Sequence, residues 1–291
     1  MPRRSTRCLS SIVFAACRIL LCVFAVSATA ADLEVLHADS LAGPMRALKQ
    51  AFEAKQPGVV LRLTPGVSPE LAARILIGET CDVFAPSSPA VIDQELMNKK
   101  IAGTDKDAAT WYVVFSVNEM VIITAKGNPL GVKQLADLAR PGVKFARVTG
   151  DKDLATARTI EFLKREATLE GRPELAQQIV GASPADPAKP TSVPDTVNAV
   201  REGRANAGVV YYSAAIAARD DVDIIRFPDS VNLSEAIRNA ATVPGTARNP
   251  AHAVAFVRFL LSAEAQSILR DAGQPPVVPA LRKGAVPAAL D

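Results

Sequence analysis

The sequence predicts an α/β fold of two lobes, with mixed, mostly parallel sheets flanked by helices and a ligand cleft between the lobes. From residue 31 onward, short apolar runs alternate with longer amphipathic stretches, the pattern of strand and helix in turn. The apolar run over 110–124 is long for one strand and carries a polar break at 116–119, so it is able to begin in one lobe and finish in the other. A second crossing is expected near 235–243. Such a chain holds a ligand between its lobes, at strand ends and helix starts.

The first 30 residues are predicted to be a cleavable secretory signal. Arginines at positions 3, 4 and 7 precede an apolar run over 9–26, and Ala28-Thr29-Ala30 supplies small residues for cleavage. The alternative is an uncleaved membrane anchor, which Arg18 disfavours because it interrupts the run. With 1–30 as signal peptide, we expect one lobe to comprise 31–117 plus 241–291 and the other 118–240.

Removing this segment changes the charge and the cysteine content. The chain of 291 residues has 33 Lys and Arg against 30 Asp and Glu, a net charge of +3. The segment holds four arginines and no acids, so 29 Lys and Arg remain against 30 acids, a net charge of −1. Nothing then favours nucleic acid as a partner. Cys81 is the one cysteine left, which excludes an intramolecular disulfide, and roughly 260 residues bury a core without one.

The sequence offers no arrangement typical of a zinc site or of common catalytic motifs. His37 and His252 are its two histidines and lie more than 200 positions apart. GxSxG, HExxH, GxxxxGK[ST] and GxGxxG are all absent. An enzyme on this scaffold would therefore lack a recognisable nucleophile and base pair.

Each element follows from its local pattern. Apolar, β-branched segments bounded by turn residues predict strands at 33–37, 59–63, 81–85, 110–124, 143–148, 206–212 and 222–227. Helical spacing predicts helices at 43–55, 69–78, 90–99, 133–139, 155–168, 193–201 and 250–271. Pro57-Gly58 stops the first helix, Pro69 starts the second, and Gly273 ends the last. The proline-rich tail after Gln274 is expected to lie over the first lobe.

Two serines stand where a strand gives way to a helix. Ser40 follows the first strand, and Ser68 precedes Pro69 at the start of the second helix. A helix start presents unpaired N–H groups and partial positive charge, which suits an anion. An ordinary N-cap is the alternative, because capping is what serine commonly does there.

The chain resembles the periplasmic molybdate- and tungstate-binding proteins of ABC importers, which have the two-lobed type II periplasmic-binding-protein fold. His37-Ala38-Asp39-Ser40-Leu41 and the run over 111–121 are similar to the archaeal tungstate/molybdate branch. The bacterial molybdate branch is resembled by the segments Ser68-Pro69-Glu70-Leu71-Ala72-Ala73-Arg74, Cys81-Asp82-Val83-Phe84-Ala85 and Ala207-Gly208-Val209-Val210-Tyr211. No single motif is specific, and their order and spacing carry the resemblance.

The resemblance implies five binding positions. The bacterial pattern holds an oxyanion with two serines, two backbone amides and a tyrosine hydroxyl, which fall here on Ser40, Ser68, Ala157, Val193 and Tyr211. Molybdate and tungstate carry no proton at neutral pH and only accept hydrogen bonds, which amides and hydroxyls donate. For Tyr211 the alternative is packing at the strand end.

The sequence departs from the family pattern in three ways, and Asp39, Asp153 and Arg158 are secondary candidates for ligand binding. Asp39 stands beside Ser40, where its carboxylate would oppose an anion unless it turns outward or caps the helix; with Asp153 it could instead bind a cation. Arg158 replaces a glycine-like position and either reaches the anion or faces solvent. The archaeal branch adds two carboxylates to the metal of the anion, but Val210 or Tyr211 occupies the strand position, so we expect a tetrahedral, non-covalently bound anion.

The resemblance therefore implies a periplasmic, monomeric solute-binding protein that closes on molybdate or tungstate and delivers it to an ABC transporter permease. It implies no cofactor, no metal other than that of the anion, and no enzymatic activity. Sulfate, another oxyanion or a small carboxylate is the alternative ligand. A binding module that signals to a receptor would share the same cleft.

Overall fold

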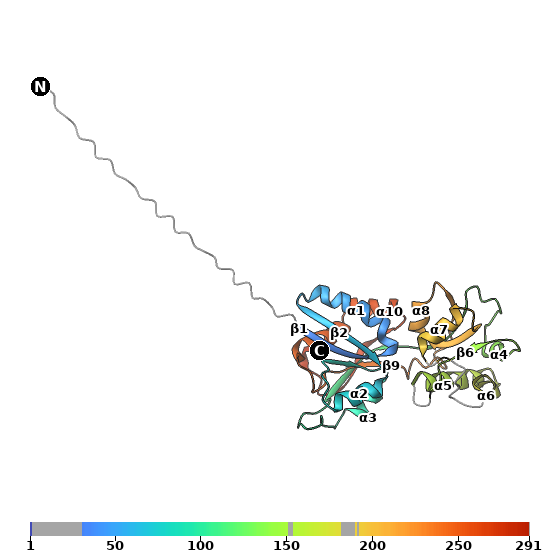
Figure 1. Cartoon of the computed structure of the whole chain (residues 1–291), viewed down its shortest axis with the longest axis horizontal. Helices are drawn as coiled ribbons and strands as arrows, with labels where there is room; N and C mark the ends of the chain where they lie inside the picture. The colour runs from blue at the N-terminus through green and yellow to red at the C-terminus, as the bar shows by residue number, and fades with distance from the viewer. Residues whose placement is uncertain (2–30, 151–153, 182–189, 191, 291) are drawn as a thin grey trace.

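The computed structural model describes residues 1, 31–150, 154–181, 190 and 192–290. The predicted signal peptide and Asp153 lie outside this part of the chain. Figure 1 shows two lobes side by side, with α1, α2, β1 and β2 in one and α4 to α8 in the other. Within the described ranges, no helix combines the length and the apolar character that crossing a membrane requires.

The first lobe contains two three-stranded sheets. One is parallel, with the order β2-β1-β3, and consists of β1 (Ala31–Ala38), β2 (Val59–Gly66) and β3 (Val83–Ala85). The other is antiparallel, with the order β10-β4-β9, and consists of β4 (Trp111–Val117), β9 (Arg238–Ala241) and β10 (Pro276–Gly284). A bridge between Phe84 and Thr242 joins the two sheets. Since β10 pairs with β4, the predicted position of the tail over this lobe is confirmed.

Helices cover these sheets, and aromatic rings fill the space beneath them. The helices are η1 (Asp39–Leu41), α1 (Ala42–Lys55), α2 (Ser68–Leu76), α3 (Pro89–Glu95), α9 (Pro250–Leu260), α10 (Ala263–Asp271) and η2 (Ala288–Leu290). Phe52 of α1 packs on Phe256 and Phe259 of α9, with ring centroids 5.0 and 5.5 Å apart. The single helix predicted over 250–271 is two helices, because Ser262 caps α10 by accepting a hydrogen bond from the Ala265 amide.

The second lobe is built on one four-stranded sheet. Its order is β6-β7-β5-β8, formed by β5 (Met120–Ala125), β6 (Phe145–Ala146), β7 (Ala207–Tyr211) and β8 (Val222–Ile225). Its helices are α4 (Leu135–Leu138), α5 (Leu154–Leu169), α6 (Glu174–Val180), α7 (Val193–Arg201) and α8 (Tyr212–Ala217). The short helices α6 and α8 were not predicted from the sequence.

Antiparallel pairs are more frequent than the alternation of strands and helices predicts. Met120, which begins β5, pairs with Tyr211, which ends β7, and Val117, which ends β4, pairs with Arg238, which begins β9. In each pair one strand begins at the junction of the lobes and its neighbour ends there, so the two strands run in opposite directions. Both lobes are thus mixed α/β units.

The chain crosses between the sheets twice. The apolar run predicted over 110–124 is confirmed as serving both lobes, because it divides into β4 and β5 at Asn118 and Glu119. On the return, Ile237 packs in a hydrophobic cluster of the second lobe and Ala241 in the main cluster of the first. Since β9 pairs with β4 from Arg238 onward, the first lobe's sheet includes three residues that precede the predicted boundary at 241.

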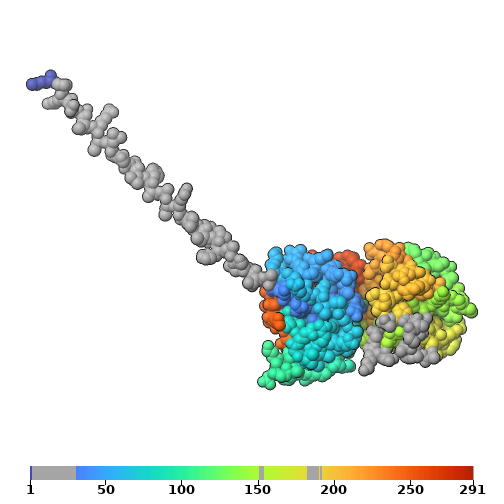
Figure 2. Space-filling model, in the orientation of Figure 1, coloured from blue at the N-terminus to red at the C-terminus, as the bar shows by residue number. Residues whose placement is uncertain are grey.

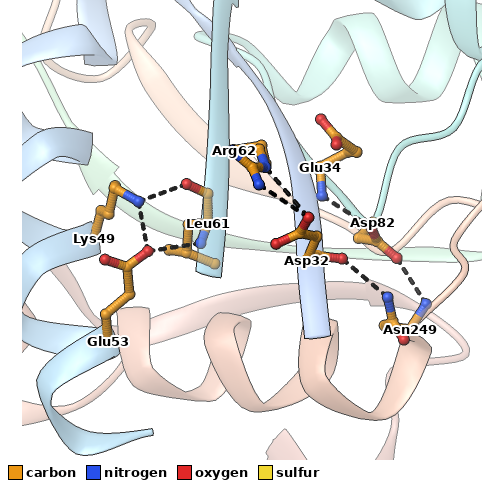
Figure 3. A network of polar contacts seen from close by, with 8 residues as sticks. All are labelled: Asp32, Glu34, Lys49, Glu53, Leu61, Arg62, Asp82 and Asn249. Carbon is orange, nitrogen blue, oxygen red and sulfur yellow. Dashed lines mark hydrogen bonds and ion pairs between the residues drawn. The ribbon is translucent and has the colours of Figure 1, made fainter. Parts of the chain in front are cut away.

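A buried carboxylate ties the first lobe together at the end of its sheet (Figure 3). Asp82 is fully buried and accepts hydrogen bonds from the backbone amides of Glu34, Arg248 and Asn249, at 2.9, 2.8 and 2.8 Å. Backbone amides stabilise a buried carboxylate as charge-assisted donors. The contact joins β1 and β3 to the start of α9, segments more than 160 positions apart in the sequence.

Candidate functional site

A cavity of about 650 Å³ lies between the two lobes. Figure 2 shows the blue and teal surface of the first lobe meeting the yellow and green surface of the second. From the first lobe the cavity is lined by η1, the start of α1, the turn from β2 into α2, and Ser87 after β3. From the second it is lined by the starts of α5 and α7, the end of β7, and α8. Strand ends and helix starts therefore converge on it from both sides, as expected for this topology.

Ser40 and Ser68 both line the cavity, and neither is an N-cap. Ser40 lies within η1, Ser68 is the first residue of α2, and neither helix start has a side-chain cap hydrogen bond. Ser262 shows what a capping serine does in this chain, since it accepts a hydrogen bond from a backbone amide one turn on. The Ser68 hydroxyl instead accepts a long hydrogen bond, 3.4 Å, from the amide of Ser87.

Arg158 joins the two lobes beside these serines. It projects from the first turns of α5 and donates to the carbonyl of Ser87 at 2.7 Å, to the Ser87 hydroxyl at 3.4 Å and to the Tyr211 hydroxyl at 3.0 Å. Its guanidinium carbon also lies 5.8 Å from the centroid of the Tyr211 ring. Ser87 belongs to the first lobe and Tyr211 to the second, so one side chain spans the junction.

The Arg158 side chain is buried and has no carboxylate partner among the described residues. Only 9% of the residue is exposed, and no carboxylate of the described residues forms an ion pair with it. A buried cation is costly unless an opposite charge or several hydrogen bonds compensate it. The neutral oxygens of Ser87 and Tyr211 compensate it in part, and an anion in the cavity would complete the compensation.

The predicted binding residues are brought together with one exception. Val193, the first residue of α7, and Tyr211, the last of β7, line the cavity with the two serines. Ala157 does not, because its side chain is exposed and the start of α5 presents Leu154 and Ala155 to the cavity. Two residues correspond to about 200° around a helix, so Ala157 faces away from the side that Ala155 occupies.

The secondary candidates have distinct positions. Asp39 is exposed at the rim of the cavity. Arg158 is turned inward rather than to solvent, and Asp153 lies outside the described residues. Ser87, which is 5% exposed, was not selected from the sequence. The available signal was its place after a third strand of the parallel sheet, in the turn Pro86-Ser87-Ser88-Pro89.

Two buried titratable groups of the first lobe, His37 and Cys81, are neutral. His37 is buried, and burial lowers its pKa, so the ring is neutral; its Nδ1 lies 2.9 Å from the Ala38 carbonyl and must carry the proton. Burial raises the pKa of the Cys81 thiol, which makes it unreactive. Among the described residues, no group of three or more His, Cys, Asp and Glu side chains could hold a metal ion.

The arrangement of two lobes around a donor-lined cavity agrees with comparisons to known proteins. Residues 33–274 match the family model described as bacterial extracellular solute-binding protein. The chain belongs to this family. It is 31% identical to the molybdate-binding protein ModA of Mycobacterium tuberculosis over an alignment of 245 residues. The alignment covers 84% of this chain and 84% of that protein.

Solved structures of other binding proteins share the fold. The periplasmic molybdate-binding protein of Azotobacter vinelandii superposes with a TM-score of 0.62 at 17% identity, covering 83% of this chain and 98% of that one. The sulfate-binding protein SubI of Mycobacterium tuberculosis superposes with a TM-score of 0.64 at 19% identity, covering 86% of this chain and 88% of that one. At these identities the superpositions show the two-lobed fold of a solute-binding protein.

Proposed function

We propose that this solute-binding protein captures a tetrahedral oxyanion, molybdate or tungstate, between its lobes and delivers it to an ABC transporter permease. The observation that carries the proposal is Arg158, a buried cation that lacks a carboxylate partner among the described residues and lies beside Ser68, Ser87 and Tyr211. Similarity to ModA supports the choice of anion.

The donors around the cavity suit an anion that carries no proton. The hydroxyls of Ser40 and Ser68 and the amide at the start of α7 line the cavity, and the guanidinium of Arg158 is bonded to the lining residues Ser87 and Tyr211; all of these groups are donors. Each charge-assisted hydrogen bond contributes about 1.5–3 kcal/mol. Four or five such bonds correspond to sub-micromolar affinity once the costs of ordering the protein and ligand are subtracted.

The size of the cavity supports a closing motion of the lobes. At about 30 Å³ for a water molecule in the liquid, 650 Å³ holds roughly twenty waters, much more than the four oxygens of one oxyanion fill. We therefore propose that the lobes rotate together around Asn118–Glu119 and the segment before Arg238 when the anion binds. Closure excludes water, which strengthens each hydrogen bond to the charged ligand.

A small carboxylate is the second candidate ligand, and Arg158 is the observation that favours it. A guanidinium offers two parallel N–H donors that match a planar carboxylate better than a tetrahedral anion. A carboxylate with a few carbon atoms would also fill more of the cavity. We rank it second because the serine and helix-start donors suit four oxygens arranged around a centre.

The remaining parts of the proposal follow from the family and from the N-terminal sequence. The extracellular solute-binding family agrees with export through the predicted signal peptide, and we propose a periplasmic location. We propose that the protein acts as a monomer, since the lobes of one chain suffice to surround the cavity.

A thermal-shift series on the purified protein tests the ligand directly. Molybdate, tungstate, sulfate, phosphate and citrate are compared at matched concentration and ionic strength. An anion present at a hundred times its Kd adds about 2.7 kcal/mol, a rise in Tm of about 5–10 °C for a chain of this size. Molybdate or tungstate is expected to give the largest rise. A large shift with citrate and none with molybdate would establish the carboxylate instead, and no shift with any anion would refute the proposal.

A further inference from the structure

The backbone of Ser40 is held by donors from both lobes. Its carbonyl oxygen accepts a hydrogen bond of 2.8 Å from Nε2 of Gln274, which follows α10 in the first lobe. The same oxygen accepts a 3.4 Å hydrogen bond from the hydroxyl of Ser213 in α8 of the second lobe. The main chain of Ser40, a proposed binding residue, is thus anchored from both lobes.

Gln274 connects Ser40 to both strands that run to the lobe junction in the first lobe. Its Oε1 accepts hydrogen bonds from Nδ2 of Asn239 on β9 at 2.6 Å and from the hydroxyl of Ser116 on β4 at 3.5 Å. Asn239 also donates to the Ser116 hydroxyl at 2.9 Å. All three side chains are fully buried. The Gln274 amide is oriented by these partners, because the opposite orientation would set its oxygen against the Ser40 carbonyl.

Ser213 connects Ser40 to the first crossing segment. Its hydroxyl accepts a 2.8 Å hydrogen bond from Nδ2 of Asn118, which lies between β4 and β5. Oδ1 of Asn118 in turn accepts from the backbone amides of Ser213 and Glu119, at 3.3 and 3.0 Å. The route through Ser213 therefore ends on the first crossing segment, and the route through Gln274 ends on β4 and β9 next to the two crossings.

We propose that Gln274 is a positioning residue for Ser40. It holds the η1 backbone in register with β4 and β9, so that the Ser40 hydroxyl and the neighbouring amides are already directed into the cavity before the anion arrives. Preorganisation of this kind increases affinity by removing the cost of ordering the loop on binding. A buried amide side chain costs free energy unless its polar atoms are hydrogen-bonded. In Gln274 both the oxygen and Nε2 of the amide have hydrogen-bond partners.

Two features separate this role from ligand contact and from general stability. Gln274 is not among the residues that line the cavity, so a change there removes no bond to the ligand. Gln266 is a matched control, since it lies on the preceding helix α10 and its amide donates to a backbone carbonyl, that of Leu261, at 3.0 Å. Substituting either glutamine by methionine keeps the length of the side chain and removes the donor.

The first measurement needs no ligand. In hydrogen–deuterium exchange of the unliganded protein, Gln274→Met is expected to increase exchange in the peptide 39–48 at least fivefold, and not in the peptide 59–66 from β2. Gln266→Met is expected to change neither peptide. Unchanged exchange in 39–48, or an equal increase in both peptides, would overturn the proposal. If Gln274→Met does not fold, Gln274→Leu replaces it, because that side chain also lacks the donor to the Ser40 carbonyl.

The second measurement uses sodium molybdate and rests on the proposed function. Calorimetric titration is expected to show about a tenfold higher Kd for Gln274→Met and a change under twofold for Gln266→Met. Equal affinity of Gln274→Met and wild type would overturn the positioning role. If the wild type binds no molybdate, the proposed function fails, and the exchange experiment still decides whether Gln274 holds Ser40.

Discussion

Substitution of Arg158 by glutamine tests the central feature of the site. The wild-type guanidinium is buried and bonded to Ser87 and Tyr211, but no carboxylate of the described residues neutralises it. Glutamine retains a donor of shorter reach and removes the charge. We therefore expect anion affinity and the stability of the unliganded protein to respond in different directions.

The magnitude follows from the bonds that would be lost. One charge-assisted hydrogen bond to the anion contributes about 1.5–3 kcal/mol, which corresponds to a Kd about 10–150 times higher. The unliganded protein loses its hydrogen bonds to Ser87 and Tyr211, but it no longer buries a cation that has no carboxylate partner among the described residues, a change that is often neutral or stabilising. We expect its Tm to stay equal or to rise.

The assay is calorimetric titration with molybdate, paired with thermal melts of the unliganded protein. Arg46→Gln is the control, because Arg46 lines the cavity and is exposed to solvent, whereas Arg158 is buried and bonded to the lining residues Ser87 and Tyr211. An exposed charge contributes about 1 kcal/mol or less, so its Kd should rise no more than about fivefold. If Arg158→Gln binds every anion within twofold of the wild type, the reasoning about the buried charge is refuted.

Three further predictions concern single residues. Ser68→Ala should raise the molybdate Kd through the loss of about 1–3 kcal/mol, whereas Ser262→Ala should lower stability by about 1 kcal/mol and leave the Kd unchanged; the opposite pattern would make Ser68 an ordinary structural serine. Burial lowers the pKa of His37 below 6.5, so the unfolded chain takes up the proton first and stability falls as pH drops below 6.5, by up to about 1.4 kcal/mol per pH unit; thermal melts of His37→Gln should show a smaller decline in that window, and equal slopes would contradict it. Burial and neighbouring Glu170 raise the pKa of Glu166 above 4.5, so ionisation costs stability as pH rises through the folded value, and Glu166→Gln should melt higher than wild type at pH 7 but not at pH 4. A lower Tm for that variant at both pH values would contradict the prediction for Glu166.

Much of the fold could be predicted because each element is encoded in its own neighbourhood. The apolar run over 110–124 indicated a strand shared between lobes, and β4 and β5 divide where the polar residues Asn118 and Glu119 interrupt it. The prediction was wrong where a single residue determines the end of one helix and the start of the next. The Ser262 hydroxyl splits the last helical pattern in two because it satisfies a backbone amide that a continuous helix would bond within itself.

The candidate site could be predicted in part for the same reason. Ser68 begins a helix, Tyr211 ends a strand and Ser40 lies in η1 between β1 and α1, and these junctions come together between the lobes. Ala157 is not among the residues that line the cavity, and the amide contact that the resemblance implies for it stays a prediction, because it depends on where the helix begins and on its rotation. The start of α5 at Leu154 turns Ala155 toward the cavity and Ala157 away.

By itself, the sequence determined the order of strands and helices, the α/β class and the polar residues at the strand ends, because hydrophobic period and turn chemistry act over a few residues. Only the tertiary structure decided which polar groups meet. Arg158 reaches Ser87 from 71 positions away, and Gln274 reaches the Ser40 carbonyl from 234 positions away. Such contacts depend on how two sheets and their crossing strands pack, and side-chain hydrogen bonds over that separation leave no periodic signal in the chain.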